Sequence, residues 1–191
     1  KHPVIVENLM GIKRRKGTFQ KGKKPLLIKD LKQLINVINS EKEPDLKKLR
    51  NKAILLVGFS GGFRRNEIVS LNLEDIEFVF EGVKIRVKKS KTDQFGEGMI
   101  KGIPHFENSI YCPVTALRRW LNTSKIKDGA IFVKFSKGSK ITRRRLTDQS
   151  IALIIKDYLI KAGIDSRNYS GHSLRSGFAT SAAESGAEER S

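Results

Sequence analysis

Histidine and arginine stand three residues apart in the stretch 171–180, at His172 and Arg175. The stretch has the pattern of a helix start, and on a 3.6-residue period these two side chains share one face. Arginine offers a planar fork of donors that matches two phosphate oxygens, and histidine can move a proton near neutral pH. The pair therefore suits phosphate chemistry, whereas the competing interpretation is an ordinary solvated helix face.

The same helix has an apolar side. Leu174, Phe178 and Ala182 recur at a spacing of four residues. We expect these three side chains to enter the core. In that case the helix would present its imidazole and guanidinium groups to the outside.

A second arginine, Arg64, follows a glycine-rich stretch at residues 58–62 and has a carboxylate, Glu67, one helical turn later. The glycines are expected to let the backbone approach a neighbour closely. The pair is either an exposed ion pair, contributing under about 1 kcal/mol, or an arginine held in position to clamp a phosphate. The spacing alone leaves both interpretations open.

Residues 74–104 change to the two-residue period of strands. Apolar residues alternate over 76–80 and again over 83–87, with a Glu-Gly turn between them, which predicts a β-hairpin. A third strand is expected from Met99 to Ile103, ending at Pro104. Lys91 lies in the polar loop before it. An ammonium group there can protonate a leaving alkoxide, although most loop lysines are merely solvated.

The rest of the chain is mostly helical in pattern. Apolar stripes predict helices over 29–40 and 45–60, a short helix through Ile68 and Leu71, a helix beginning at Pro113, and a helix over 147–161 that ends at Gly163. Residues 130–135 form a short apolar run. The predicted fold class is mainly α with a small antiparallel β-sheet (α+β).

The composition points to a polyanionic partner. Among 191 residues, 38 Lys and Arg against 20 Asp and Glu produce a formal charge of +18. Nucleic acid is the first candidate and an anionic membrane the second. The membrane is disfavoured because no apolar run approaches 18 residues. The single cysteine, Cys112, excludes an internal disulfide, and neither zinc-ligand spacing nor a signal peptide is found. We expect a cytoplasmic protein.

Two basic segments are candidates for contact with a phosphate backbone. Within residues 11–24, seven of fourteen residues are Lys or Arg, which indicates either a disordered tail or a strap along nucleic acid. A second basic run occupies 143–145. The backbone-contact candidates are Lys13, Arg14, Arg15, Lys16, Arg143, Arg144 and Arg145.

Arg64, Lys91, His172 and Arg175, in this order, make the chain resemble the catalytic domain of tyrosine recombinases, the phage integrase family. The segment 62–68 resembles the family's first-arginine box, in which an acidic residue follows the arginine by three positions. The segment 90–93 resembles the lysine turn between two strands, and 171–177 resembles the His-x-x-Arg box. The resemblance runs from about residue 25 to the end.

The resemblance implies a reaction and a role for each residue. A tyrosine attacks a DNA phosphodiester, forms a 3′-phosphotyrosyl link and releases a 5′-hydroxyl, with no metal or other cofactor. Arg64 and Arg175 would stabilise the pentacoordinate phosphorane. Lys91 would protonate the leaving oxygen, His172 would assist the nucleophile as a base, and Glu67 would support the site. Double-stranded DNA is the implied partner, bound by a homotetramer on two duplexes.

The chain departs from the family pattern at its end. The family's nucleophilic tyrosine and a second His or Trp lie downstream of the His-x-x-Arg box, whereas Tyr111, Tyr158 and Tyr169 all precede it and match no family position. We expect these three to be structural. The expected organisation is a basic interdomain linker at 1–24 and a catalytic domain at 25–191 without its nucleophile segment. Such a fragment would bind DNA without cleaving it.

Other functions remain open. One alternative is a non-catalytic nucleic-acid-binding protein of the same fold. Another is a basic RNA-binding protein that owes nothing to the four residues in particular. A metal-dependent nuclease is disfavoured because the sequence shows no clustered carboxylates or histidine pairs at ligand spacing.

Overall fold

The computed structural model describes residues 23–41, 45–88 and 98–186. The helices are α2 (Ile28–Ser40), α3 (Asp45–Ser60), α4 (Arg65–Ser70), α5 (Pro113–Ser124), α6 (Asp148–Lys161) and α7 (Ser173–Glu184), with short 3-10 turns η1 (Leu73–Asp75) and η2 (Ser166–Asn168). The strands are β1 (Ile76–Val79), β2 (Gly82–Val87), β3 (Met99–Pro104), β4 (Val133–Phe135) and β5 (Ile141–Arg145). The predicted mainly helical fold with little antiparallel sheet is confirmed.

Helices α2, α5 and α6 bury the predicted apolar stripes, and α5 and α6 also begin at capped first turns. Helix α5 begins at Pro113, and the thiol of the preceding Cys112 accepts the N–H of Thr115. The hydroxyl of Thr147 caps α6 in the same way, and Gly163 (φ +72°) follows its end. The stripe of α2 is buried at Leu31, Leu34, Ile35 and Ile38.

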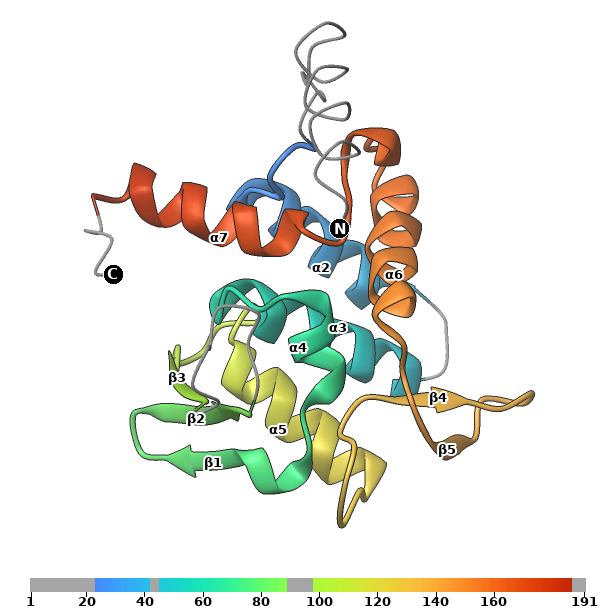
Figure 1. The fold of residues 1–191 in the computed structure, drawn as a ribbon. Coiled ribbons are helices and arrows are strands. Elements are labelled where there is room, and N and C mark those ends of the chain that lie inside the picture. Colours follow the sequence, from blue (N-terminus) through green and yellow to red (C-terminus); the bar gives the residue numbers. More distant parts are fainter. Residues whose placement is uncertain (1–22, 42–44, 89–97, 187–191) are drawn as a thin grey trace, which may run out of the picture.

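Strands β1, β2 and β3 form the predicted antiparallel sheet in sequence order. Residues 83, 85 and 87 of β2 face the core, while Lys84 and Arg86 are exposed. Strands β4 and β5 form a second antiparallel pair. The run at 130–135 did not reveal this pair, because its alternation covers too few residues. Figure 1 shows the two sheets on opposite sides of helices α4 and α5.

Helix α3 lies at the centre of the core. Residues 53–57 are all buried, and the helix packs against α2, α4, α5, α6 and α7. In Figure 1 it runs between α7 above and α5 below. A helix enclosed on most sides is buried around its circumference rather than along one stripe. The core therefore reaches from the β1–β3 sheet, through α5 and α3, to the helix that carries His172 and Arg175.

Helix α7 enters the core with a different set of residues from the predicted one. Leu174 is fully buried as expected, but Phe178 is 39% exposed. Its other buried positions are small residues: Ser173, Gly177 and Ser181. The prediction that Phe178 is a core residue was wrong. Its ring lies at the surface edge-on to Phe59, with 6.4 Å between ring centroids.

The physical reason is the close approach of segment 23–27 to α7. A Cβ atom placed on Gly177 would lie 1.9 Å from the carbonyl oxygen of Leu26. The N–H of Leu26 donates to the carbonyl of Ser173 at 2.9 Å, and the Ser173 hydroxyl donates to the carbonyl of Lys24 at 2.7 Å. A large side chain has no room on this face, so the small residues are the ones buried.

Candidate functional site

Arg64 is the N-terminal cap position of α4, and residues 61–63 connect it to the end of α3. Gly62 has a φ of +54°, a left-handed conformation that favours glycine. The Arg64 backbone N–H donates to Glu67 Oε2 at 2.9 Å, and its Nη1 donates to Oε1 at 2.8 Å. Glu67 is only 2% exposed. The structure therefore pairs the two residues as their spacing predicts, and the carboxylate is buried rather than part of a surface ion pair.

The electrostatics keep this carboxylate ionised. Burial raises the pKa of Glu67, but the hydrogen bonds from Arg64 and the positive charges of Lys101 and Arg64 outweigh burial, so the pKa lies below its usual value. An ionised Glu67 holds the Arg64 guanidinium through a charge-assisted hydrogen bond.

Arg175 extends from the first turn of α7 back to the same turn. Its Nη1 donates to the carbonyl oxygen of Gly62 at 2.8 Å, two residues before Arg64. The arginines thus reach one short backbone segment from two different helices. The charges of both also act on the ammonium group of Lys101. The structure therefore places both arginines at the turn between α3 and α4, and their joint role at one phosphate stays a prediction.

His172 is the N-terminal cap position of α7 and is exposed, as is Arg175. Its backbone N–H donates to the hydroxyl of Ser170 at 3.2 Å, and its carbonyl accepts the N–H of Ser176. Within the described residues no hydrogen bond of its imidazole is found. Its role as a base stays a prediction.

Direct packing joins the first-arginine segment to the His-x-x-Arg segment. A Cβ atom on Gly171 would lie 1.8 Å from Cδ of Arg65, so the Arg65 side chain lies against the turn that enters α7. Deeper in the core, Leu174 of α7 and Ile68 of α4 both contact α3 at Gly58. The predicted close approach at the glycine stretch is confirmed there. This packing fixes how α7 is placed relative to Arg64.

Several predicted residues lie outside the described part of the chain. Lys91 belongs to the segment 89–97, and the arm candidates belong to the segment 1–22. These arm candidates are Lys13, Arg14, Arg15 and Lys16. Their contacts with DNA, and the role of Lys91 as an acid, stay predictions.

The second basic run forms strand β5, and its three arginines differ. Arg145 donates to the carbonyl oxygen of Val69 at 2.5 Å and of Leu71 at 3.2 Å, and also to the side-chain oxygen of Asn72. Its guanidinium therefore fastens β5 to the end of α4. Arg143 and Arg144 are exposed, so backbone contact by this run stays a prediction carried mainly by these two.

Residues 25–191 match the family model described as "Phage integrase family". The chain belongs to the phage integrase family. An integrase/recombinase xerD homolog of Selenomonas ruminantium is 43% identical over 176 residues, covering 92% of this chain and 51% of that protein. The tyrosine recombinase XerA of Pyrococcus horikoshii is 26% identical over 167 residues, covering 87% of this chain and 50% of that protein. The chain spans about half the length of the curated relatives it matches.

Solved structures of integrases share the fold. The XerH recombinase bound to its difH substrate superposes with a TM-score of 0.66 at 20% identity, covering 86% of this chain and 44% of that one. The catalytic core of lambda integrase superposes with a TM-score of 0.57 at 16% identity, covering 85% of both chains. The matched part of the chain therefore has the fold of an integrase catalytic core.

The tyrosines of this integrase chain have structural partners. Tyr158 is buried, and Tyr111 and Tyr169 are at least partly covered. The Tyr111 hydroxyl donates to the side-chain oxygen of Asn36. Those of Tyr158 and Tyr169 donate to the carboxylates of Glu41 and Asp30, respectively. Burial and the Asp30 charge raise the pKa of Tyr169. These environments are those of packing residues, as predicted.

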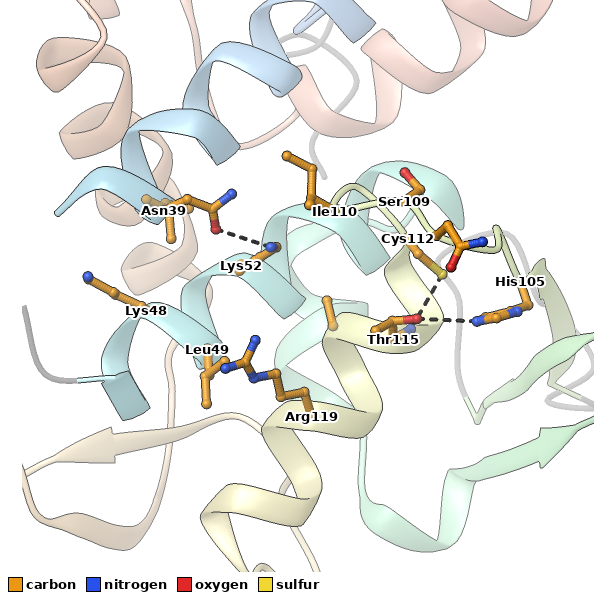
Figure 2. Close-up of a pocket in the computed structure, with 13 residues that line it drawn as sticks. Asn39, Lys48, Leu49, Lys52, His105, Ser109, Ile110, Cys112, Thr115 and Arg119 are labelled. Carbon is orange, nitrogen blue, oxygen red and sulfur yellow. Dashed lines mark hydrogen bonds between the residues drawn. The ribbon is translucent and has the colours of Figure 1, made fainter.

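A basic pocket of this integrase fold lies away from the two arginines. It has a volume of about 650 Å³ and lies between α2, α3 and α5, beside the loop 105–112 (Figure 2). Lys48, Lys52 and Arg119 line it, and none of its described lining residues is a carboxylate. Lys52 donates to Asn39 at 3.1 Å, and burial together with the Arg119 charge lowers its pKa. Arg64, His172 and Arg175, the predicted catalytic residues that the structure describes, do not line this pocket.

Sequence reasoning missed Lys101, which contacts the first-arginine segment from strand β3. A signal was present: the two-residue period places position 101 on the same strand face as the core residue Ile103. A lysine at an apolar register position calls for a buried partner.

Residues 23–41, 45–88 and 98–186 contain neither a metal-binding cluster nor a membrane-spanning helix. Their His, Cys, Asp and Glu side chains form no group of three or more placed to hold a metal ion. No helix in these ranges has the length and apolar character needed to span a membrane.

Proposed function

We propose that this chain is the catalytic part of a tyrosine-type site-specific DNA recombinase, a protein of DNA integration and mobile genetic elements. The complete protein would cleave and rejoin DNA through a 3′-phosphotyrosyl intermediate. Arg64 and Arg175 would stabilise the phosphorane, Lys91 would protonate the leaving 5′-oxygen, and His172 would assist the tyrosine. Glu67 would hold Arg64. Membership of the phage integrase family supports this proposal.

The observation that carries the proposal is that both guanidinium groups are held by acceptors of one short segment, residues 62–67. Glu67 holds one and the Gly62 carbonyl holds the other. Within the described residues, Arg175 donates to Gly62 and to no other residue, which leaves N–H groups of its fork for phosphate oxygens. Two fixed cations at one phosphate supply the positive charge that a transition state with developing negative charge requires.

The proposed domain organisation keeps a basic linker at 1–24 and a catalytic domain from residue 25 onward. The start of the family match at residue 25 supports this boundary. The nucleophilic tyrosine would come from sequence beyond this chain. Two observations support that placement: the chain spans about half of its relatives, and Tyr111, Tyr158 and Tyr169 have structural partners.

The proposed partner is double-stranded DNA, met in the cytoplasm at the nucleoid. The formal charge of +18 supports a polyanionic partner. Binding would be mainly to phosphate and would weaken as salt rises. The complete protein would act as a homotetramer on two duplexes. A lambda integrase of the same fold has been crystallised as a tetramer on a Holliday junction.

A nicked suicide substrate tests the proposal. The complete gene product should form a covalent protein–DNA adduct, and Arg64→Ala or Arg175→Ala should slow adduct formation by about 10²- to 10³-fold. The 191-residue chain alone should bind the same duplex without forming an adduct. An adduct formed by the 191-residue chain would refute the placement of the nucleophile. No adduct with the complete product would favour the non-catalytic DNA-binding alternative.

A further inference from the structure

Lys101 is a charged residue on the core side of strand β3. In the antiparallel register it lies opposite Ile85, a fully buried residue of β2, and two positions before the buried Ile103. Its side chain is 12% exposed. A lysine in such a place requires specific partners for its ammonium group, because burying a charge without them is strongly unfavourable.

The partners of the Lys101 ammonium belong to the first-arginine segment. Nζ donates to the carbonyl oxygen of Gly61 at 2.7 Å and of Gly62 at 3.3 Å. It lies 3.9 Å from Glu67 Oε2 and 4.5 Å from the ring centroid of Phe63. Lys101 therefore ties the β1–β3 sheet to the turn between α3 and α4.

Two of these partners are the groups that hold the arginines. The Gly62 carbonyl also accepts Nη1 of Arg175 at 2.8 Å. The Glu67 carboxylate also accepts the backbone N–H and Nη1 of Arg64. One ammonium group thus touches both acceptors on which the two guanidinium groups depend, and in each case it shares the acceptor with the arginine.

Burial and three neighbouring charges act on the Lys101 ammonium, and together they lower its pKa. Burial lowers the pKa of Lys101, the Glu67 carboxylate raises it, and the charges of Arg175 and Arg64 lower it again. Two cations, Arg64 and Lys101, therefore contact one buried carboxylate, and Arg175 is close enough for its charge to act on Lys101. Removing the Lys101 ammonium would leave the Gly61 carbonyl without this donor. It would also change the positions of the Gly62 carbonyl and the Glu67 carboxylate, the two acceptors that Lys101 shares with the arginines.

We propose that Lys101 is a positioning residue that sets the separation of the Arg64 and Arg175 guanidinium groups for one DNA phosphate. This inference rests on the proposed function, since it concerns how the same two arginines are aimed. Lys101 does not touch DNA itself, because its ammonium group is directed to the protein backbone. A displacement of about 1 Å at a reacting centre can slow a reaction about 100-fold.

The first test measures arginine order without any DNA. Selective ¹⁵N labelling follows the Nη–H signals of Arg64 and Arg175 in wild type, Lys101→Met and Lys156→Met, because Nη1 of each makes the hydrogen bond in question. Lys156 is an exposed lysine of α6, so it controls for loss of one charge. Lys101→Met should speed hydrogen exchange of both signals about tenfold, and Lys156→Met should leave them unchanged. Unchanged exchange in Lys101→Met would overturn the proposal whether or not the protein cleaves DNA.

The second test measures cleavage of a suicide substrate by the complete protein at saturating DNA. Lys101→Met should cleave about 100-fold more slowly than Lys156→Met, while their DNA dissociation constants agree within about threefold. Equal cleavage rates would overturn the proposal. Lys101→Gln keeps N–H donors without the charge and should cleave at an intermediate rate. If thermal denaturation shows that Lys101→Met is unfolded, Lys101→Gln takes its place in the comparison.

A double-mutant cycle separates positioning from general loss of stability. If Lys101 acts through the arginines, Lys101→Met combined with Arg175→Lys should cleave about as slowly as the slower single variant. If the rate losses of the two single variants instead multiply in the double variant, Lys101 acts independently of Arg175, and the proposal would be overturned. A wild-type protein that forms no adduct would instead refute the proposed function, and the hydrogen-exchange test would then decide the role of Lys101 alone.

Discussion

Gly177→Ala is the substitution that best tests how α7 is placed. Alanine is favoured over glycine in a helix by about 1 kcal/mol, so local propensity predicts stabilisation. The tertiary contact predicts the reverse. The new Cβ would lie 1.9 Å from the Leu26 carbonyl oxygen, a backbone atom, where real Cβ contacts are essentially never under 3.0 Å. Segment 23–27 and α7 must therefore move apart by about 1 Å or more.

This separation has a calculable effect. Overpacking costs about 1–3 kcal/mol. The hydrogen bonds from Leu26 to Ser173 and from Ser173 to Lys24 would weaken, at about 1 kcal/mol each. After the gain in propensity, we expect Gly177→Ala to lower the free energy of unfolding by about 2–4 kcal/mol. Arg175 lies on the same helix, so its bond to Gly62 would also be disturbed.

Urea denaturation of the 191-residue chain measures the effect, provided that the slope with denaturant stays constant. Gly102→Ala is the matched control, because a Cβ there meets nothing within 4 Å and the change should be neutral or slightly stabilising. If Gly177→Ala proved as stable as wild type or more so, helix propensity would outweigh the contact. The close crossing of α7 by segment 23–27 would then be refuted.

Two further predictions concern the charged groups. The pKa of Glu67 is lowered in the folded chain, so its stabilisation is present above the unfolded pKa and is lost as pH falls through the folded pKa. Wild type should therefore lose more stability than Glu67→Gln between about pH 5 and pH 3; parallel pH profiles of thermal unfolding would contradict this. Arg145→Ala removes donors to three acceptors and should lower the free energy of unfolding by about 2 kcal/mol. Arg144→Ala should change the free energy of unfolding by under about 0.5 kcal/mol. It should reduce the slope of log K against log[salt] for DNA binding by about 1. Equal stability of the two variants would contradict the role of Arg145 in holding β5 against the end of α4.

The amino-acid sequence by itself determined the features that depend on near neighbours. Apolar stripes predicted the helices, and alternation predicted the β1–β2 hairpin. The pairing of Arg64 with Glu67 followed from a spacing of three residues, because one helical turn brings such side chains together wherever the helix lies. The order of the motifs also predicted the integrase family.

Only the tertiary structure decided which distant groups meet. Arg175 reaches Gly62 because α7 packs across α3, and no local period encodes that crossing. Phe178 has helical core spacing, yet the passing backbone at Leu26 leaves room only for Gly177. Lys101 stands on a core-facing strand position whose partners are supplied by the α3–α4 turn. Local periodicity sets which side of an element is apolar, whereas packing between elements decides how close that side can come to its neighbours and which polar groups find partners there.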